Sequence, residues 1–333
     1  MRFARALALA VALAAAAVAA HAPDSLLAAA IRAGYDQDYR ASGELLGRIN
    51  CPDNLEPVVA FWRAALVQLE LYDSGNPLLA DSFYTLSDRA VAACERRIAD
   101  APKDPAAHAL LGMTQLNRAG LQSWQKRRLD ALRTLLGVER HFRRALELDS
   151  TQADARLGLG TTEYFRATID RYLLGLKLFG SRARAYRLVE DAVAADPGLA
   201  DAGDLLLAYM RKEDGDYREA TTHCANVLER HPGNRTALRM LRDVRREAGE
   251  FRAVLELGKE IETSIGAAFP QNRYGLAENR LAMAKAWRGS GRTDSLVACC
   301  DRIIAWEQYR DSVPWLPDYI VEARAMKKKA GAR

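Results

Sequence analysis

The chain has 333 residues, of which 49% are hydrophobic and 27% are charged, with 48 basic against 43 acidic side chains. A formal net charge of +5 over this length is close to neutral. It gives no support to a nucleic-acid-binding role, which is marked by a strongly basic surface.

The first residues have the layout of a secretory signal peptide. Two arginines precede an unbroken apolar run over residues 6–20, and Ala20 and Ala22 place small residues at the −3 and −1 positions of a cut. A cut before His21 is an open alternative. The run is shorter than the roughly 20 residues of a membrane-spanning helix, and no later stretch is apolar enough for one. We therefore expect a signal peptide over 1–22 and an exported protein, periplasmic or secreted, without a transmembrane span.

The segments that follow read as helical hairpins. Residues 26–50 form a short one, and residues 57–72 with 82–99 form the next, both with a weak repeat pattern. From there on, four segments close in the same way, on an apolar helix end that proline follows in three cases. Their last residues, Pro102, Ser150, Pro197 and Pro232, lie 48, 47 and 35 residues apart. The last spacing is close to the 34 residues of a known class of helical repeat, and the first two exceed that length by 14 and 13 residues.

The unit over 201–234 carries the fullest pattern. Leu207 and Ala208 lie on its first helix, Gly215 begins the turn, and Ala220 is a small residue on the second helix. A small residue at such a position allows two helices to approach closely. The signature of the first helix recurs in the two preceding units at Leu111, Gly112, Leu159 and Gly160.

This pattern resembles the tetratricopeptide repeat (TPR) family. The resemblance implies an all-α, right-handed superhelical solenoid of about seven helical hairpins with a capping helix at the C-terminus. The expected divisions are the signal peptide (1–22), degenerate N-terminal hairpins (23–101), repeats (102–268) with lengthened hairpins near 105–150 and 153–197, and a last hairpin with the capping helix (269–333).

The two lengthened hairpins are apolar on more than one face, which leaves two interpretations open. In the first, the inserts around Trp124, Leu129, Leu132 and Leu136 and around residues 172–179 cover one another as a packed flange. In the second, a protruding apolar tip binds a partner or touches a membrane surface. That tip would consist of Tyr172, Leu173, Leu176 and Phe179.

No catalytic, cofactor-binding or metal-binding motif is present in the sequence. Cys94, Cys224 and Cys300 fall at one position of the second helix in three units, which predicts buried thiols outside any disulfide. The pairing of Cys51 stays open. Histidines are too few and too scattered for a metal site. We therefore expect no enzyme and no cofactor, with an enzyme built on a helical toroid as a distant alternative.

Four arginines, Arg235, Arg239, Arg242 and Arg246, follow helical spacing along one stripe. The stripe is either a solvated face or an anion-binding wall.

TPR arrays bind peptides or domains on the concave face lined by the first helices, so the resemblance implies a non-enzymatic protein-binding scaffold or adaptor of the cell envelope. The partner is a protein or peptide of unknown identity. The alternative is a soluble component that binds a small molecule or lipid beside the lengthened hairpins. Carried over by position, the binding face includes Tyr164, Tyr209, Lys212, Arg239, Asp243, Arg246, Lys285 and Arg288.

Overall fold

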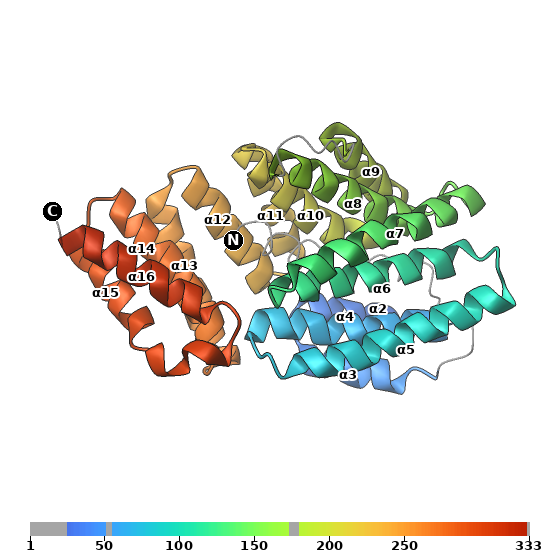
Figure 1. Ribbon diagram of the computed structural model, residues 1–333, viewed down its shortest axis with the longest axis horizontal. Coiled ribbons are helices and arrows are strands. Elements are labelled where there is room, and N and C mark those ends of the chain that lie inside the picture. The colour runs from blue at the N-terminus through green and yellow to red at the C-terminus, as the bar shows by residue number, and fades with distance from the viewer. Residues whose placement is uncertain (1–24, 51–54, 173–179, 332–333) are drawn as a thin grey trace. The chain divides into compact units, whose positions relative to one another are not determined.

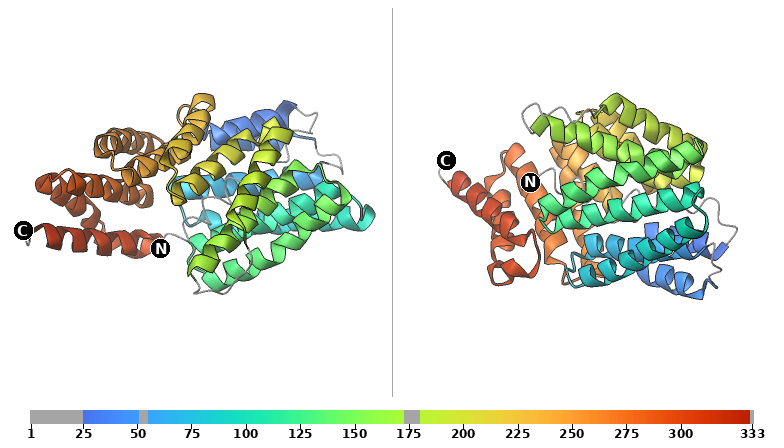
Figure 2. Two further views of the ribbon diagram at one scale, coloured as in Figure 1. Left: turned by 90° about the horizontal axis from the view of Figure 1, so that it is seen from above. Right: turned by 45° about the vertical axis from the view of Figure 1, so that its right-hand side comes forward.

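The computed structural model describes residues 25–50, 55–172 and 180–331 (Figure 1). Over these residues the chain forms fifteen α-helices, α2 to α16, and no strand. Figure 2 presents the same helices from two further directions. The predicted signal peptide lies outside the described residues and stays a prediction.

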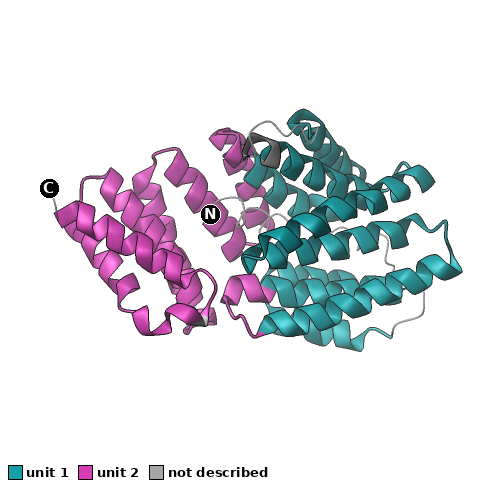
Figure 3. Ribbon diagram, viewed as in Figure 1, with its two compact units in different colours: residues 1–69, 79–210 teal, residues 70–78, 211–333 magenta. Residues whose placement is uncertain are grey.

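The helices belong to two compact units (Figure 3). Unit 1 comprises residues 1–69 and 79–210, and unit 2 comprises residues 70–78 and 211–333. The domain boundaries expected from the sequence remain predictions.

Unit 1 contains the first hairpins. Within it α2 packs on α3, α6 on α7 and α8 on α9, and α5 and α7 each also contact the following helix. Its helices are α2 (Ser25–Tyr35), α3 (Tyr39–Arg48), α4 (Glu56–Ser74), α5 (Leu79–Asp100), α6 (Pro105–Trp124), α7 (Arg128–Leu148), α8 (Ala153–Tyr172), α9 (Arg182–Ala195), the 3₁₀ helix η2 (Pro197–Leu199) and α10 (Ala200–Glu213), the ends of α4 and α10 belonging to unit 2.

Unit 2 contains the last hairpins and the final helix. Here α12 packs on α13 and α14 on α15, while α16 contacts both α14 and α15. Its elements are α11 (Tyr217–Arg230), α12 (Arg235–Glu247), α13 (Phe251–Ala268), α14 (Arg273–Gly289), α15 (Thr293–Ile304), the 3₁₀ helix η3 (Glu307–Ser312) and α16 (Leu316–Gly331).

The fold class predicted from the sequence is confirmed. The described chain is all-α, and its helices follow one another as seven consecutive pairs, α2–α3 to α14–α15, with α16 as the last helix. This is a TPR-like arrangement of helical hairpins. Among the described helices, none is both long and apolar enough to cross a bilayer.

The turns inside the hairpins of unit 2 share one geometry. Gly215, Gly249 and Gly291 have φ angles of +84°, +79° and +71°, a region that glycine adopts without steric cost. The amide of Gly215 donates to the carbonyl oxygen of Lys212 at 3.1 Å. Asp216 then caps the second helix by accepting from the amide of Glu219 at 3.3 Å. The glycine turn read from the sequence is therefore present.

Small residues on the first helices create the close packing of unit 1. The buried ring of Phe142 on α7 lies against Gly112 of α6 and Gly158 of α8, where an added Cβ would come within 2.6 Å and 2.2 Å of the ring. Neither position has room for a side chain unless Phe142 moves. Gly112 belongs to the leucine–glycine signature read from the sequence, whereas Gly158 lies two residues before the signature residue Gly160. An added Cβ at Gly160 would come within 2.8 Å of Val189, so both signature glycines mark a packing constraint.

The lengthened hairpin α6–α7 has helices of 20 and 21 residues, against 14 each for α10 and α11. Trp124 of α6 is buried, Leu132 of α7 is partly buried, and Leu129 and Leu136 of α7 are 71% and 53% exposed. The packed-flange interpretation is therefore wrong for this face of α7. The residues proposed for an apolar tip, Leu173, Leu176, Phe179 and the side chain of Tyr172, lie outside the described residues.

Candidate functional site

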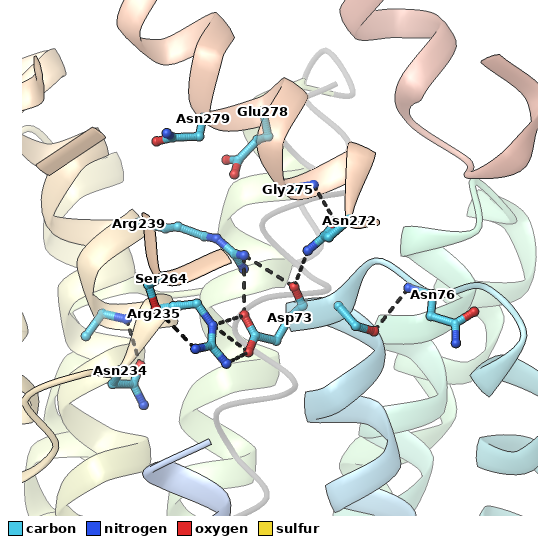
Figure 4. Close-up of polar contacts among 12 residues, drawn as sticks. Asp73, Asn76, Asn234, Arg235, Arg239, Ser264, Asn272, Gly275, Glu278 and Asn279 are labelled. Carbon is cyan, nitrogen blue, oxygen red and sulfur yellow. Dashed lines mark hydrogen bonds and ion pairs between the residues drawn. The ribbon is translucent and has the colours of Figure 1, made fainter. Parts of the chain in front are cut away.

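The first two arginines of the α12 stripe share one carboxylate. Arg235 Nε lies 2.9 Å from each carboxylate oxygen of Asp73, near the end of α4, and Arg235 Nη2 also bonds Asp73 Oδ2 (Figure 4). Arg239 Nη2 lies 3.3 Å from Asp73 Oδ1. The side chain of Asp73 is 1% exposed and that of Arg235 is 9% exposed. Pairing is required here because an isolated buried charge costs several kcal/mol.

The backbone around Asp73 is held by α14. Asn272 Nδ2 donates to the carbonyl oxygen of Asp73 at 2.7 Å, and Asn272 Oδ1 accepts from the amide of Gly275 at 2.8 Å, which caps the helix. Gly75 has a φ of +66°, and a Cβ there would lie 2.8 Å from Asn272 Oδ1 and from Tyr274 Cβ. Only glycine fits both the backbone conformation and the space.

The third arginine, Arg242, is 1% exposed and lies in a separate polar cluster. Its guanidinium donates to Asn279 Oδ1, Glu278 Oε1 and Asp243 Oδ1, each at 2.9 Å. Burial by itself raises the pKa of Asp243, but the positive charges of Arg242, Arg246 and Lys212 together outweigh it, so the pKa falls to about 2. Asp243 is therefore ionised throughout the neutral range.

Neither interpretation of the stripe describes these three arginines. Arg235 and Arg242 are buried, so they are not a solvated face. Their guanidinium groups already contact Asp73, Asp243 and Glu278, so they do not form an open anion-binding wall. The stripe is mainly a structural element of unit 2, and its last member, Arg246, has the most exposed side chain of the four, at 21%.

Further charged groups that are partly exposed lie on every second helix, at the end of α10 and on α12, α14 and α16. Lys212, Asp243, Arg246, Lys285 and Glu322 have side chains that are 13% to 30% exposed. Arg246 Nε lies 3.8 Å from Asp243 Oδ1, and Lys285 Nζ lies 2.8 Å from Glu322 Oε1. The guanidinium of Arg288 is exposed and has no ion-pair partner among the described residues. We name as the charged face the residues Lys212, Asp243, Arg246, Lys285, Arg288 and Glu322.

The predicted aromatic members of the binding face lie in unit 1 and are buried. The ring centroids of Tyr164 and Tyr209 are 6.0 Å apart in an edge-to-face contact, and Tyr164 Oη donates to the carbonyl oxygen of Met210 at 3.2 Å. These rings stabilise the packing of α8 against α10. A partner has no access to them in this structure. Arg239 is likewise directed toward Asp73.

The thiols are placed as the repeat positions predict. Cys94, Cys224 and Cys300 are buried, Cys299 is partly buried, and none of these four is in a disulfide. Cys51 lies outside the described residues. In the part of the chain that the structure describes, no group of three or more His, Cys, Asp or Glu side chains is arranged to hold a metal ion.

Three residues of the site could not be singled out from the sequence. Asp73 ends an apolar helix and is separated from Arg235 by 162 positions, and Asn272 and Asn279 look like ordinary helix residues. The only local signal was a lone acid followed closely by Gly75, a combination that also ends many helices.

No protein-family model and no curated protein matches the chain. Among solved structures, the chain is similar to PilW, described as a widely conserved type IV pilus biogenesis factor, with a TM-score of 0.48, 16% identity, and coverage of 76% of this chain and 96% of that one. It is similar to a human IFIT1 dimer with m7Gppp-AAAA, with a TM-score of 0.48, 10% identity, and coverage of 99% and 82%. It is also similar to a monomeric IFIT1 mutant with Gppp-AAAA, with a TM-score of 0.49, 10% identity, and coverage of 97% of this chain and 82% of that one. Likeness at this level says nothing about what the chain binds.

Proposed function

We propose that the chain is a non-enzymatic protein-binding scaffold, an adaptor of the cell envelope, that holds a protein or peptide partner on the charged face of unit 2. The observation that carries this proposal is the set of partly exposed charges on α10, α12, α14 and α16, several of them held in place by ion pairs. Groups already fixed in position lose little conformational entropy on binding. The signal-peptide pattern of residues 1–22 supports an exported location, periplasmic or secreted.

The signs of the charges favour a protein over a nucleic acid. Each basic group has an acidic neighbour: Asp243 lies beside Lys212 and Arg246, and Glu322 pairs with Lys285. A phosphate backbone is matched by a uniformly basic surface, whereas mixed charges match a mixed protein surface and determine its register.

The chemistry of the face also favours binding over catalysis. A general acid or base works best with a pKa near the working pH. The pKa of Asp243 is lowered to about 2, although burial opposes that shift, because Arg242, Arg246 and Lys212 stabilise the carboxylate. Such a group holds a cation and exchanges no proton at neutral pH.

A capture experiment tests the proposal. Immobilised full-length protein is incubated with an envelope extract, and the retained proteins are quantified by mass spectrometry. The amount of specific partner retained by the double variant Lys285→Glu with Arg246→Glu should fall at least about tenfold, since reversed charges repel the matching surface. The control Arg252→Glu changes an exposed arginine of α13 and should retain it.

A second variant separates binding from stability. Exchanging the pair as Lys285→Glu with Glu322→Lys keeps an ion pair between α14 and α16 but reverses its polarity. We expect native helix content by circular dichroism together with weakened capture. Equal capture by the wild type and both charge-altered variants would refute the proposal.

A second candidate function is contact with an apolar ligand or a lipid surface, and the exposure of Leu129 and Leu136 on the lengthened helix α7 favours it. Cosedimentation with phospholipid vesicles tests it. Leu129→Asp with Leu136→Asp should abolish vesicle binding, whereas Leu78→Asp, at another exposed leucine, should not.

A further inference from the structure

A hollow of about 530 Å³ lies between α4 and α5 in unit 1. Four charged side chains line it, namely Glu56 and Arg63 from α4 and Arg89 and Arg96 from α5. Its volume is in the range of sites that hold a small ligand or a few peptide residues. Its charge is unbalanced, with three guanidinium groups against one carboxylate.

The register of the two helices explains where the imbalance lies. Arg96 Nη2 bonds Glu56 Oε1 at 2.7 Å, so these two residues are at the same level of the hairpin. Arg63 lies seven residues further along α4 and Arg89 seven residues back along α5. Because the helices are antiparallel and rise equally per residue, Arg63 and Arg89 share a second level, roughly 10 Å from the first.

The two ends of the hollow therefore differ. At the first end the charges of Glu56 and Arg96 cancel. At the second end Arg63 Nη2 donates to the backbone carbonyl of Leu46 at 3.0 Å, and the exposed guanidinium of Arg89 has no partner among the described residues. Neither arginine has a carboxylate there. Two guanidinium forks at one level match an incoming carboxylate, which can accept bonds from both.

Between these two levels the hollow is apolar. Ala60 lies four residues along α4 from Glu56, and Ala92 lies four residues back along α5 from Arg96, so the two alanines face each other. Their small side chains leave the space that forms the hollow. The lining residues Val59 and Leu86 extend this apolar floor.

We propose that this hollow binds a short acidic peptide segment of a partner, with a carboxylate between Arg63 and Arg89 and an apolar side chain over the two alanines. An extended segment advances about 3.3 Å per residue, so three to four residues span the two levels. The site is separate from the charged face and extends the proposed function with a second contact on the other unit.

Fluorescence anisotropy with the full-length protein tests the assignment. The probe is a fluorescein-labelled peptide Gly-Glu-Leu-Glu-Gly, and the matched probe has Gln in place of both Glu residues. At low ionic strength the wild type should bind the Glu peptide at least about tenfold more tightly than the Gln peptide. Added salt should weaken that binding, because the arginines at the rim are exposed.

Three variants locate the binding. Arg89→Glu and Arg89→Gln should each weaken binding of the Glu peptide by about tenfold or more, while Arg187→Glu, at an exposed arginine of α9 outside the hollow, should leave it within about twofold. Ala92→Leu fills the hollow without changing any charge and should also weaken binding.

Lys285→Glu on the charged face should have no effect on this peptide, so failure of the proposed function and failure of this site are distinguishable. The assignment is overturned by equal binding of the Glu and Gln peptides, by equal effects of Arg89→Glu and Arg187→Glu, or by full binding in Ala92→Leu. It is also overturned if free acetate or phosphate competes as strongly as the unlabelled peptide at the same concentration.

Discussion

Arg235 contacts both carboxylate oxygens of Asp73, although 162 positions separate the two residues in the chain. The same carboxylate also faces Arg239, and the backbone carbonyl of Asp73 accepts from Asn272 (Figure 4). One buried acid therefore connects the end of α4 with α12 and α14 inside unit 2. Because Asp73 is the counter-ion of two guanidinium groups, its charge contributes more to the stability of unit 2 than its side-chain volume does.

The first prediction is that Asp73→Asn destabilises unit 2 strongly. Asparagine keeps the shape of the side chain but removes its charge, which leaves Arg235 and Arg239 nearly buried without a counter-ion. Breaking a buried pair by removing one partner costs about 3–5 kcal/mol. Urea denaturation followed by circular dichroism should show a loss of this size in the free energy of unfolding. Asp294→Asn, at an exposed residue of α15 in the same unit, should cost less than about 0.5 kcal/mol. A comparable effect of the two variants would contradict the role assigned to Asp73.

A second prediction compares two glycines with the same backbone conformation. Gly75 and Gly215 both have positive φ, but an added Cβ at Gly215 meets nothing within 4 Å, whereas at Gly75 it meets Asn272 and Tyr274 at 2.8 Å. Gly215→Ala should cost only the backbone term, about 1–2 kcal/mol. Gly75→Ala should cost that amount plus at least about 1 kcal/mol for the steric conflict. The measurement is the midpoint of thermal unfolding of each variant. Equal decreases for Gly75→Ala and Gly215→Ala would contradict the prediction, because they would mean that Asn272 and Tyr274 move aside without loss of stability.

The helices could be predicted from the sequence because their signals are local. Asp216 and Gly215 lie next to one another at the turn that they form, and Gly112 lies in a leucine–glycine pair that marks close helix packing. A local signal of this kind needs no knowledge of distant residues. Such signals predict the hairpins from residue 102 onward, whereas the two earlier hairpins rest on the weaker apolar pattern of residues 26–50 and 57–99.

The site could be predicted only in part, because its contacts are between distant residues. The stripe of arginines on α12 was visible, but its counter-ion Asp73 is far away in sequence, so solvation and anion binding were the only interpretations available. The resemblance to a repeat family predicts that Tyr164 and Tyr209 lie on the binding face. Whether a side chain at such a position is exposed to solvent depends on its neighbours. In this chain the rings of Tyr164 and Tyr209 pack against each other and are buried.

A third prediction concerns the thiols. Cys94, Cys224 and Cys300 are fully buried, and burial is the main cause that raises the pKa of Cys94 to about 12 and that of Cys300 to about 11. The reactive thiolate is therefore scarce at neutral pH. In native protein at pH 8, a maleimide reagent mapped by mass spectrometry should label Cys299 first and these three slowly, whereas denatured protein should be labelled at all four. Native labelling of Cys94 as fast as Cys299 would rule this out.

The last prediction concerns a buried acid in unit 1. Asp154, in the first turn of α8, is 9% exposed, and its Oδ1 has no hydrogen-bond partner among the described residues. Burial, with a further contribution from the negative charge of Asp196, raises the pKa of Asp154 from 3.8 to about 8. The folded state thus keeps a proton that the unfolded state releases near pH 4. The protonated Asp154 therefore contributes its full stabilisation of the folded state below pH 4, and this contribution is lost as the pH rises toward 8.

The variant Asp154→Asn tests this, because asparagine cannot ionise. Its free energy of unfolding should match that of the wild type at low pH and exceed it by at least about 1 kcal/mol at pH 8. Asp191→Asn, at an exposed residue of α9, serves as the control and should follow the wild type at every pH. Urea denaturation at a series of pH values measures the difference, and a constant offset between Asp154→Asn and wild type would show that Asp154 is ionised in the folded protein.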